Sequence, residues 1–88
     1  MKDQCFTTMG LMELLRLENN KQLAKWGIQD HEPFAWLAFA TEELGELSEA
    51  ISEYLYRNGK SDAVVHEAIQ AATLCLKIAE MFMTVRPA

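Results

Sequence analysis

Two short clusters of oxygen-bearing side chains are the residues of this sequence best suited to chemistry. They occupy residues 42–46, with the letters EELGE, and residues 67–70, with the letters EAIQ. Positions three apart on an α-helix lie about 60° from each other around the axis, so each cluster projects two such side chains together. Hard cations such as Mg²⁺ take oxygen ligands of this kind. The expected metal ligands are Glu43, Glu46, Glu67 and Gln70.

Three helical segments must position these clusters. The first is expected from residue 7 or 8 to residue 26, where Gly27 supplies the usual C-terminal stop signal. The second is expected at about 33–58, because it opens with a proline and closes at an Asn-Gly pair. The third is expected at 61–83, with Ser61 as its N-cap. No segment shows the alternation of a strand, which makes the predicted fold class all-α.

The second segment carries an apolar pattern that predicts close packing against another helix. Its apolar residues are spaced alternately by three and four, as in a helix that crosses its neighbour at a shallow angle. The turn at Asn58 and Gly59 then makes the second and third segments an antiparallel hairpin, in which the two clusters face each other. The residues of the predicted seam are Leu37, Ala40, Leu44, Leu47, Ile51 and Tyr54.

The length of the chain indicates that its core is completed by self-association. A single domain of 88 residues buries only about 60% of its unfolded surface, and half of these residues are hydrophobic. We therefore expect one helical domain over residues 1–88, a hairpin plus an N-terminal helix. Copies of it are expected to form a homo-oligomer, a dimer or tetramer, with a four-helix-bundle core and the acidic pocket near the interface.

Composition excludes several classes of partner. The net charge of -5 and the pI near 4.9 argue against binding of polynucleotides or of anionic membranes, since both require a basic surface. A bound divalent cation can nevertheless bridge carboxylates to the phosphates of a nucleotide. Cys5 and Cys75 lack the spacing of zinc ligands, and no apolar run is long enough to span a membrane. A cytoplasmic protein is expected.

The combined pattern resembles the MazG-like all-α nucleoside triphosphate pyrophosphohydrolases, whose signature is EExxE, a spacer, and ExxD. The similarity covers about residues 22–80 and includes the upstream segment 25–33 with its Trp, His and Pro. It implies cleavage of a nucleoside triphosphate, ribo or deoxyribo, to the monophosphate and pyrophosphate, with Mg²⁺ as cofactor and Mn²⁺ as an alternative. It also implies catalytic roles for Glu42 and Glu46, one of which orients the attacking water.

Gln70 departs from this signature, because the family has Asp at that position. A neutral amide still offers an oxygen ligand, but it holds a cation less tightly than a carboxylate does. Two further functions are therefore open. One is a weakened or inactive nucleotide-binding or interaction module, and the other is hydrolysis of a modified nucleotide or of phosphoribosyl-ATP. The acidic run also has an ordinary alternative, the solvated face of an amphipathic helix.

Four residues are candidate substrate contacts. The aromatic rings could stack on a base, although a Trp at a helix end is also a common core anchor. The histidine could contact a phosphate or base, or could bond locally at the helix entry. The lysine lies two turns beyond Gln70 and could reach a phosphate, or could simply extend its stem along the surface. These residues are Trp26, His31, Trp36 and Lys77.

Overall fold

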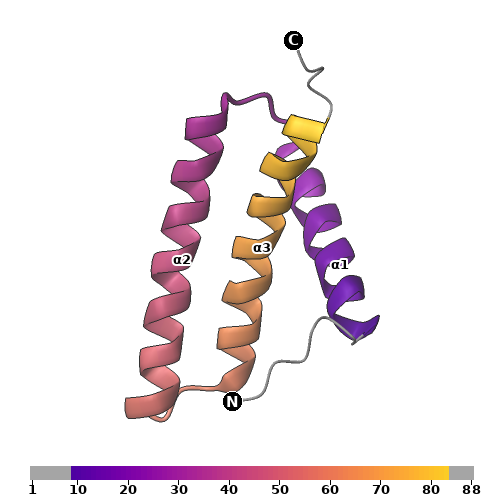
Figure 1. Cartoon of the computed structure of the whole chain (residues 1–88). Coiled ribbons are helices and arrows are strands. Elements are labelled where there is room, and N and C mark those ends of the chain that lie inside the picture. The colour runs from indigo at the N-terminus through magenta and orange to yellow at the C-terminus, as the bar shows by residue number, and fades with distance from the viewer. Residues whose placement is uncertain (1–8, 84–88) are drawn as a thin grey trace.

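Three α-helices make up the fold in the computed structural model, which describes residues 9–83 (Figure 1). They are α1 (Met9–Trp26), α2 (Pro33–Tyr56) and α3 (Ser61–Met83), and no strand occurs within that range. α2 and α3 form an antiparallel hairpin, and α1 packs on α3 and not on α2. The all-α prediction is thus confirmed. None of the three helices is long and apolar enough to cross a membrane.

Local backbone geometry explains where the helices end. Gly27 adopts φ +70°, a left-handed conformation suited to glycine, and its N–H donates to the carbonyl of Leu23 at 2.8 Å. Gly59 donates to the carbonyl of Glu53 at 2.8 Å, and a Cβ on Gly59 would lie only 2.9 Å from the Glu53 carbonyl carbon. α2 therefore ends at Tyr56, two residues before the predicted boundary, because the chain already turns back over Glu53.

α2 begins at Pro33 as predicted, whereas α3 begins one residue earlier than a cap at Ser61 would give. Glu32 caps α2, since its carboxylate accepts from the N–H groups of Phe34 at 3.2 Å and Ala35 at 2.8 Å. Ser61 is already the first residue of α3, and the N–H of Ala63 donates to the carbonyl of Lys60 at 3.2 Å. The prediction of Ser61 as N-cap was wrong by one residue, within the usual spread of helix boundaries.

The core of this chain is thin. Trp36 (6% exposed), Ala40 (1%) and Leu74 (9%) form the buried cluster, against which Ile78 and Met81 pack. Among the described residues no large side chain is completely buried. One chain alone therefore removes little apolar surface from water, as expected for a domain of this length.

The predicted seam of α2 was only partly correct. Ala40 is buried and Leu47 is half-buried, but Leu37, Leu44 and Ile51 are 48%, 50% and 41% exposed. Tyr54 is exposed as well. α3 packs instead on a stripe displaced around the α2 axis, where the large ring of Trp36 lies beside the small Ala40. The residues of this inner stripe are Trp36, Ala40, Glu43, Leu47 and Ala50.

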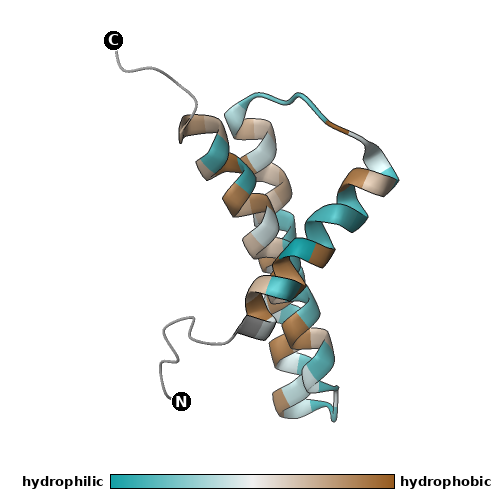
Figure 2. Cartoon of the chain, turned by 90° about the vertical axis from the view of Figure 1, so that its right-hand side faces the viewer, coloured by the Kyte–Doolittle hydropathy of each residue, from teal (hydrophilic) through white to brown (hydrophobic). Residues whose placement is uncertain are grey.

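A chain of polar side chains ties α1 to α3. Lys77 Nζ donates to Gln22 Oε1 at 2.5 Å, and Gln22 Nε2 donates to Glu18 Oε2 at 2.8 Å. Glu18 and Gln22 are buried, which makes their hydrogen bonds costly to break. Figure 2 shows that the C-terminal half of α1 is mostly hydrophilic. The attachment of α1 thus depends on specific hydrogen bonds as well as on apolar contact.

Candidate metal centre

Three carboxylates from two helices converge on one point. Glu43 and Glu46 come from α2 and Glu67 from α3, and each offers an oxygen that lies within 4.8 Å of the oxygens offered by the other two. The i, i+3 spacing on α2 projects its two glutamates together, and the antiparallel hairpin brings Glu67 opposite them. Glu43 and Glu67 are half-buried, whereas Glu46 is exposed. The cluster is open to solvent on one side.

The electrostatics of the cluster disfavour three free negative charges. The pKa of Glu43 is raised to about 7, chiefly by burial and further by repulsion from Glu46 and Glu67 and by hydrogen bonds with these two neighbours. The group therefore holds a proton near neutral pH when nothing else neutralises the cluster. A divalent cation is the other species that can relieve this repulsion.

Gln70 lies between the two helices at the edge of the cluster. With its amide nitrogen toward the carboxylates, it donates to Glu43 Oε2 at 2.9 Å and to Glu67 Oε2 at 3.1 Å, and its oxygen accepts from His66 Nε2 at 3.3 Å. The reverse orientation turns the amide oxygen toward two carboxylates, an arrangement that a cation stabilises and that is repulsive without one. The donor set therefore fits a hard cation through three carboxylates, with the amide as a fourth ligand after a rotation.

A cavity of about 320 Å³ adjoins the carboxylates. One end is acidic, where Glu42 and Glu43 line it beside Gln70. The remainder is aromatic and amide-bearing, a combination that suits a flat heteroaromatic ring with hydrogen-bonding edges. The other lining residues are Gln22, Trp26, Gln29, Trp36, Phe39 and Leu74.

The two tryptophans occupy different environments. Trp36 is a core residue, 6% exposed, and it contacts the rings of His31 and Phe39 edge-on at 5.1 and 5.9 Å between centroids. Trp26 is 54% exposed at the end of α1, with Lys25 Nζ 4.7 Å from its ring centroid. The ring available for stacking is therefore that of Trp26, while Trp36 serves mainly as the core anchor.

His31 and Lys77 do not line this cavity. His31 packs edge-on between Trp36 and Phe39, and its Nε2 is buried without a hydrogen-bond partner in the part of the chain that the structure describes. The amine of Lys77 is held by Gln22 and lies 5.5 Å from the Trp36 ring centroid. Burial lowers the pKa of Lys77, partly offset by Glu18. Both residues contact Trp36, which does line the cavity.

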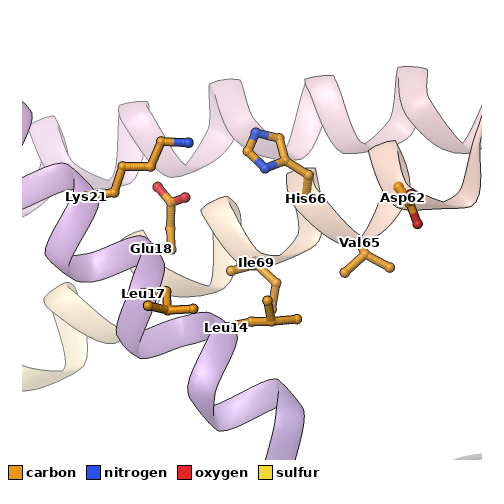
Figure 3. Close-up of a pocket in the computed structure, with 8 residues that line it drawn as sticks. All are labelled: Leu14, Leu17, Glu18, Lys21, Asp62, Val65, His66 and Ile69. Carbon is orange, nitrogen blue, oxygen red and sulfur yellow. The ribbon is translucent and has the colours of Figure 1, made fainter.

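A second cavity, of about 450 Å³, lies between α1 and α3 (Figure 3). Its floor is aliphatic, with Leu14, Leu17 and Ile69, and its rim includes Glu18 and His66. It lacks a group of carboxylates that converge as Glu43, Glu46 and Glu67 do, and the residues expected to do chemistry lie elsewhere. We therefore assign the candidate site to the acidic cluster.

Several residues beside the site were not among the predicted site residues. Phe39 precedes Glu43 by one helical turn, so its place beside the cluster follows from helical periodicity once the metal ligands are known. Gln22 and Gln29 reach the cavity through the packing of α1 on α3, whereas His66 lies one helical turn before Gln70 on the same side of α3. No family model, curated protein or solved structure matches the chain.

Proposed function

We propose that this protein is a Mg²⁺-dependent nucleotide pyrophosphohydrolase, similar to the MazG-like enzymes, which cleaves a nucleoside or deoxynucleoside triphosphate to the monophosphate and pyrophosphate. The observation that carries the proposal is the convergence of Glu43, Glu46 and Glu67 from two facing helices within 4.8 Å. A solvated acidic face scatters its charges, whereas these three carboxylates face one another at an energetic cost.

Glu43, Glu46 and Glu67 would hold the metal ion, with Gln70 as a further oxygen ligand. Mn²⁺ is an alternative to Mg²⁺, because it accepts the same oxygen ligands. When bound, the ion supplies charge neutralisation to the phosphate oxygens and to the charge that develops on them during cleavage. The loss of the Glu43 proton frees that carboxylate as a ligand.

The remaining residues bind and orient. Glu42 lines the cavity and Glu46 belongs to the adjoining carboxylate cluster; both are exposed, and either carboxylate could accept a proton from a water and orient that water in line with the scissile bond. The exposed ring of Trp26 and the amides of Gln22 and Gln29 flank the other end, where a base would stack. The acidic end therefore receives the phosphates, and the aromatic end receives the base.

A second candidate is a nucleotide-binding or interaction module with little or no hydrolysis. The observation in its favour is the hydrogen bonding of Gln70, whose amide can satisfy Glu43 and Glu67 without any cation. In this module, the neutral amide replaces one anionic ligand and lets the cluster persist without a metal ion. Self-association into a dimer or tetramer with a four-helix-bundle core belongs to both candidates.

Release of pyrophosphate from a panel of nucleoside and deoxynucleoside triphosphates, with Mg²⁺ or Mn²⁺, tests the proposal. We expect activity in the wild type, a loss of at least about 100-fold in Glu46→Ala, and little change in Glu49→Ala, an exposed glutamate on the same helix outside the cluster. Gln70→Asp should raise activity by restoring an anionic ligand. Folded protein that is inactive both as wild type and as Gln70→Asp would contradict hydrolysis and favour the module.

A further inference from the structure

The cavity of about 320 Å³ beside the carboxylates takes part of its wall from α1. Gln22 and Trp26 of this helix, and Gln29 of the loop after it, line the cavity together with residues of α2 and α3. α1 packs on α3 and not on α2. Whether this wall is complete therefore depends on how α1 is held against α3.

The buried residues of α1 are polar. Among residues 10–26, for which burial is described, only Glu18 and Gln22 are buried, at 8% and 7% exposed. Leu14, Leu17 and Leu23 remain 40%, 49% and 40% exposed. A surface helix usually docks by burying its apolar stripe, but here the leucines stay about half open. The docking of α1 thus depends on the contacts of two buried polar side chains.

These two side chains belong to a hydrogen-bonded chain that ends on α3. Lys77 Nζ donates to Gln22 Oε1 at 2.5 Å, and Gln22 Nε2 donates to Glu18 Oε2 at 2.8 Å. The Gln22 amide thus lies between a cation and an anion, with its oxygen toward the lysine and its N–H toward the carboxylate. Such charge-assisted hydrogen bonds are stronger than neutral ones. Burial lowers the pKa of Lys77 and the charge of Glu18 opposes that change, as expected for two charges that interact across the amide.

Lys77 reaches the core of the hairpin as well as α1. Its Nζ lies 5.5 Å from the ring centroid of Trp36, which lines the cavity from α2. A neighbouring cavity of about 440 Å³ is lined by Lys77 and shares Gln22, Gln29 and Trp36 with the first. Of these two cavities Lys77 lines only the neighbouring one, so it can affect an occupant of the first only through the residues that the two share.

We propose that Lys77 is a positioning residue, which holds α1 against α3 through Gln22 and Glu18 and so completes the cavity wall that carries Trp26. Without this contact α1 should separate from the hairpin as a unit, in a local unfolding event. The hairpin should stay folded, because its buried apolar cluster comes from α2 and α3 alone. The identity of the cavity's occupant, a nucleotide, rests on the proposed function, whereas the docking of α1 does not.

Hydrogen exchange of the full chain, without metal or nucleotide and read helix by helix, tests the docking. Lys77→Met keeps an unbranched apolar stem but removes the donor, and it leaves the buried carboxylate of Glu18 without its cation. We expect the amides of α1 to exchange about 10-fold faster or more, and those in the middle of α2 and α3 to change by less than about twofold. Lys77→Arg, which keeps a donor, should stay within about threefold of the wild type. Lys60→Met, at an exposed lysine outside this network, should match the wild type.

Steady-state kinetics test the consequence for the cavity. In Lys77→Met the KM for the triphosphate should rise at least about threefold while kcat changes by less than about twofold, because only molecules with α1 docked offer the complete wall. A direct contact between Lys77 and a phosphate would also weaken substrate binding, but it would leave the exchange of α1 unchanged in protein free of nucleotide. The exchange measurement therefore separates positioning from direct contact.

Three results would overturn the proposal. The first is equal exchange of the α1 amides in the wild type and Lys77→Met, and the second is a loss of protection as large in α2 and α3 as in α1. The third is faster exchange of α1 with an unchanged KM, since α1 would then not complete the wall.

Two provisions keep these outcomes decisive. If Lys77→Met does not fold, the same contrast between α1 and the hairpin is measured in Lys77→Met combined with Glu18→Gln, which leaves no unpaired charge in the network. If the wild type hydrolyses no triphosphate, the dissociation constant of the nucleotide takes the place of KM. Failure of the proposed hydrolysis is thereby distinguishable from failure of the positioning role.

Discussion

Two neighbouring stripes of residues on α2 differ in whether α3 covers them. The inner stripe of α2 contains Trp36, Ala40 and Glu43, and α3 covers it. The outer stripe contains Leu37, Leu44 and Ile51, which are more uniformly hydrophobic yet remain about half exposed. The chain thus uses its mixed stripe for its own fold and leaves its most hydrophobic stripe open. Hydrophobicity alone does not decide which side of a helix is buried within one chain, because shape and the needs of an assembly also count.

The largest expected effect is on the free energy of unfolding, and it appears when Trp36 of the inner stripe and its neighbour Leu37 of the outer stripe are each replaced by alanine. Trp36→Ala should lower the free energy of unfolding by about 3–5 kcal/mol, since it removes the largest side chain of a thin core. Leu37→Ala should cost less than about 1 kcal/mol in dilute protein, because this side chain is 48% exposed in one chain. Urea unfolding at several protein concentrations measures both.

The cost of Leu37→Ala should grow with protein concentration if the outer stripe is an interface, whereas the cost of Trp36→Ala should be large at every concentration. Equal effects of the two substitutions in dilute protein would show that the inner and outer stripes do not differ as the structure indicates.

A smaller effect on stability is expected from Mg²⁺, which would bind the carboxylate cluster that includes Glu43 of the inner stripe. A ligand that binds only the folded state adds about 1.4 kcal/mol of stability at ten times its dissociation constant. Thermal unfolding at pH 8 should therefore shift upward with Mg²⁺ in the wild type and in Glu49→Gln, but not in Glu46→Gln.

The shift should shrink at pH 5, because Glu43, whose pKa is about 7, then holds a proton in place of the cation. Identical shifts in Glu46→Gln and Glu49→Gln would place Mg²⁺ outside the cluster.

The smallest effect concerns the pH dependence of stability without metal. The pKa of Glu43 rises from 4.5 to about 7 on folding, so between these values the folded chain binds a proton that the unfolded chain releases. Its contribution to stability is thus fully present below pH 4.5 and is lost as pH rises through 7. In EDTA, Glu43→Gln should be more stable than wild type by about 1 kcal/mol at pH 8, and close to it at pH 4.

Glu49→Gln serves as the control for this comparison and should show no such difference between the two pH values. A Glu43→Gln variant that is destabilised equally at both would mean that the carboxylate supports the fold in its charged form, contrary to the direction of its pKa shift.

Much of the architecture could be predicted because it depends on local signals. Gly27, Pro33 and the Asn58-Gly59 pair mark the helix ends through backbone preferences that act within a few residues, and all three boundaries lie within two residues of expectation. The placing of Glu43 with Glu46 follows from helical geometry, and the short turn then sets Glu67 opposite them.

The packing could not be predicted in the same way. The leucine-rich spacing of α2 correctly indicates a helix-packing seam, but the pattern does not say which partner fills it. Trp36 and Ala40 are the residues of α2 that pack against α3. Glu43 lies on the same side of α2 and is therefore half-buried beside them. Likewise, the edge-on contacts of His31 and the hydrogen bonds of Lys77 depend on residues distant in sequence.

The sequence by itself therefore determined three helices, their ends, a hairpin and four oxygen-bearing side chains on its facing sides. Only the tertiary structure decided that the Gln70 amide lies beside Glu43 and Glu67, that Trp26 and not Trp36 offers an open ring, and that the outer stripe of α2 stays about half exposed. The reason is physical. Helix formation and turn chemistry depend on neighbours along the chain, whereas burial and orientation depend on how surfaces fit in three dimensions.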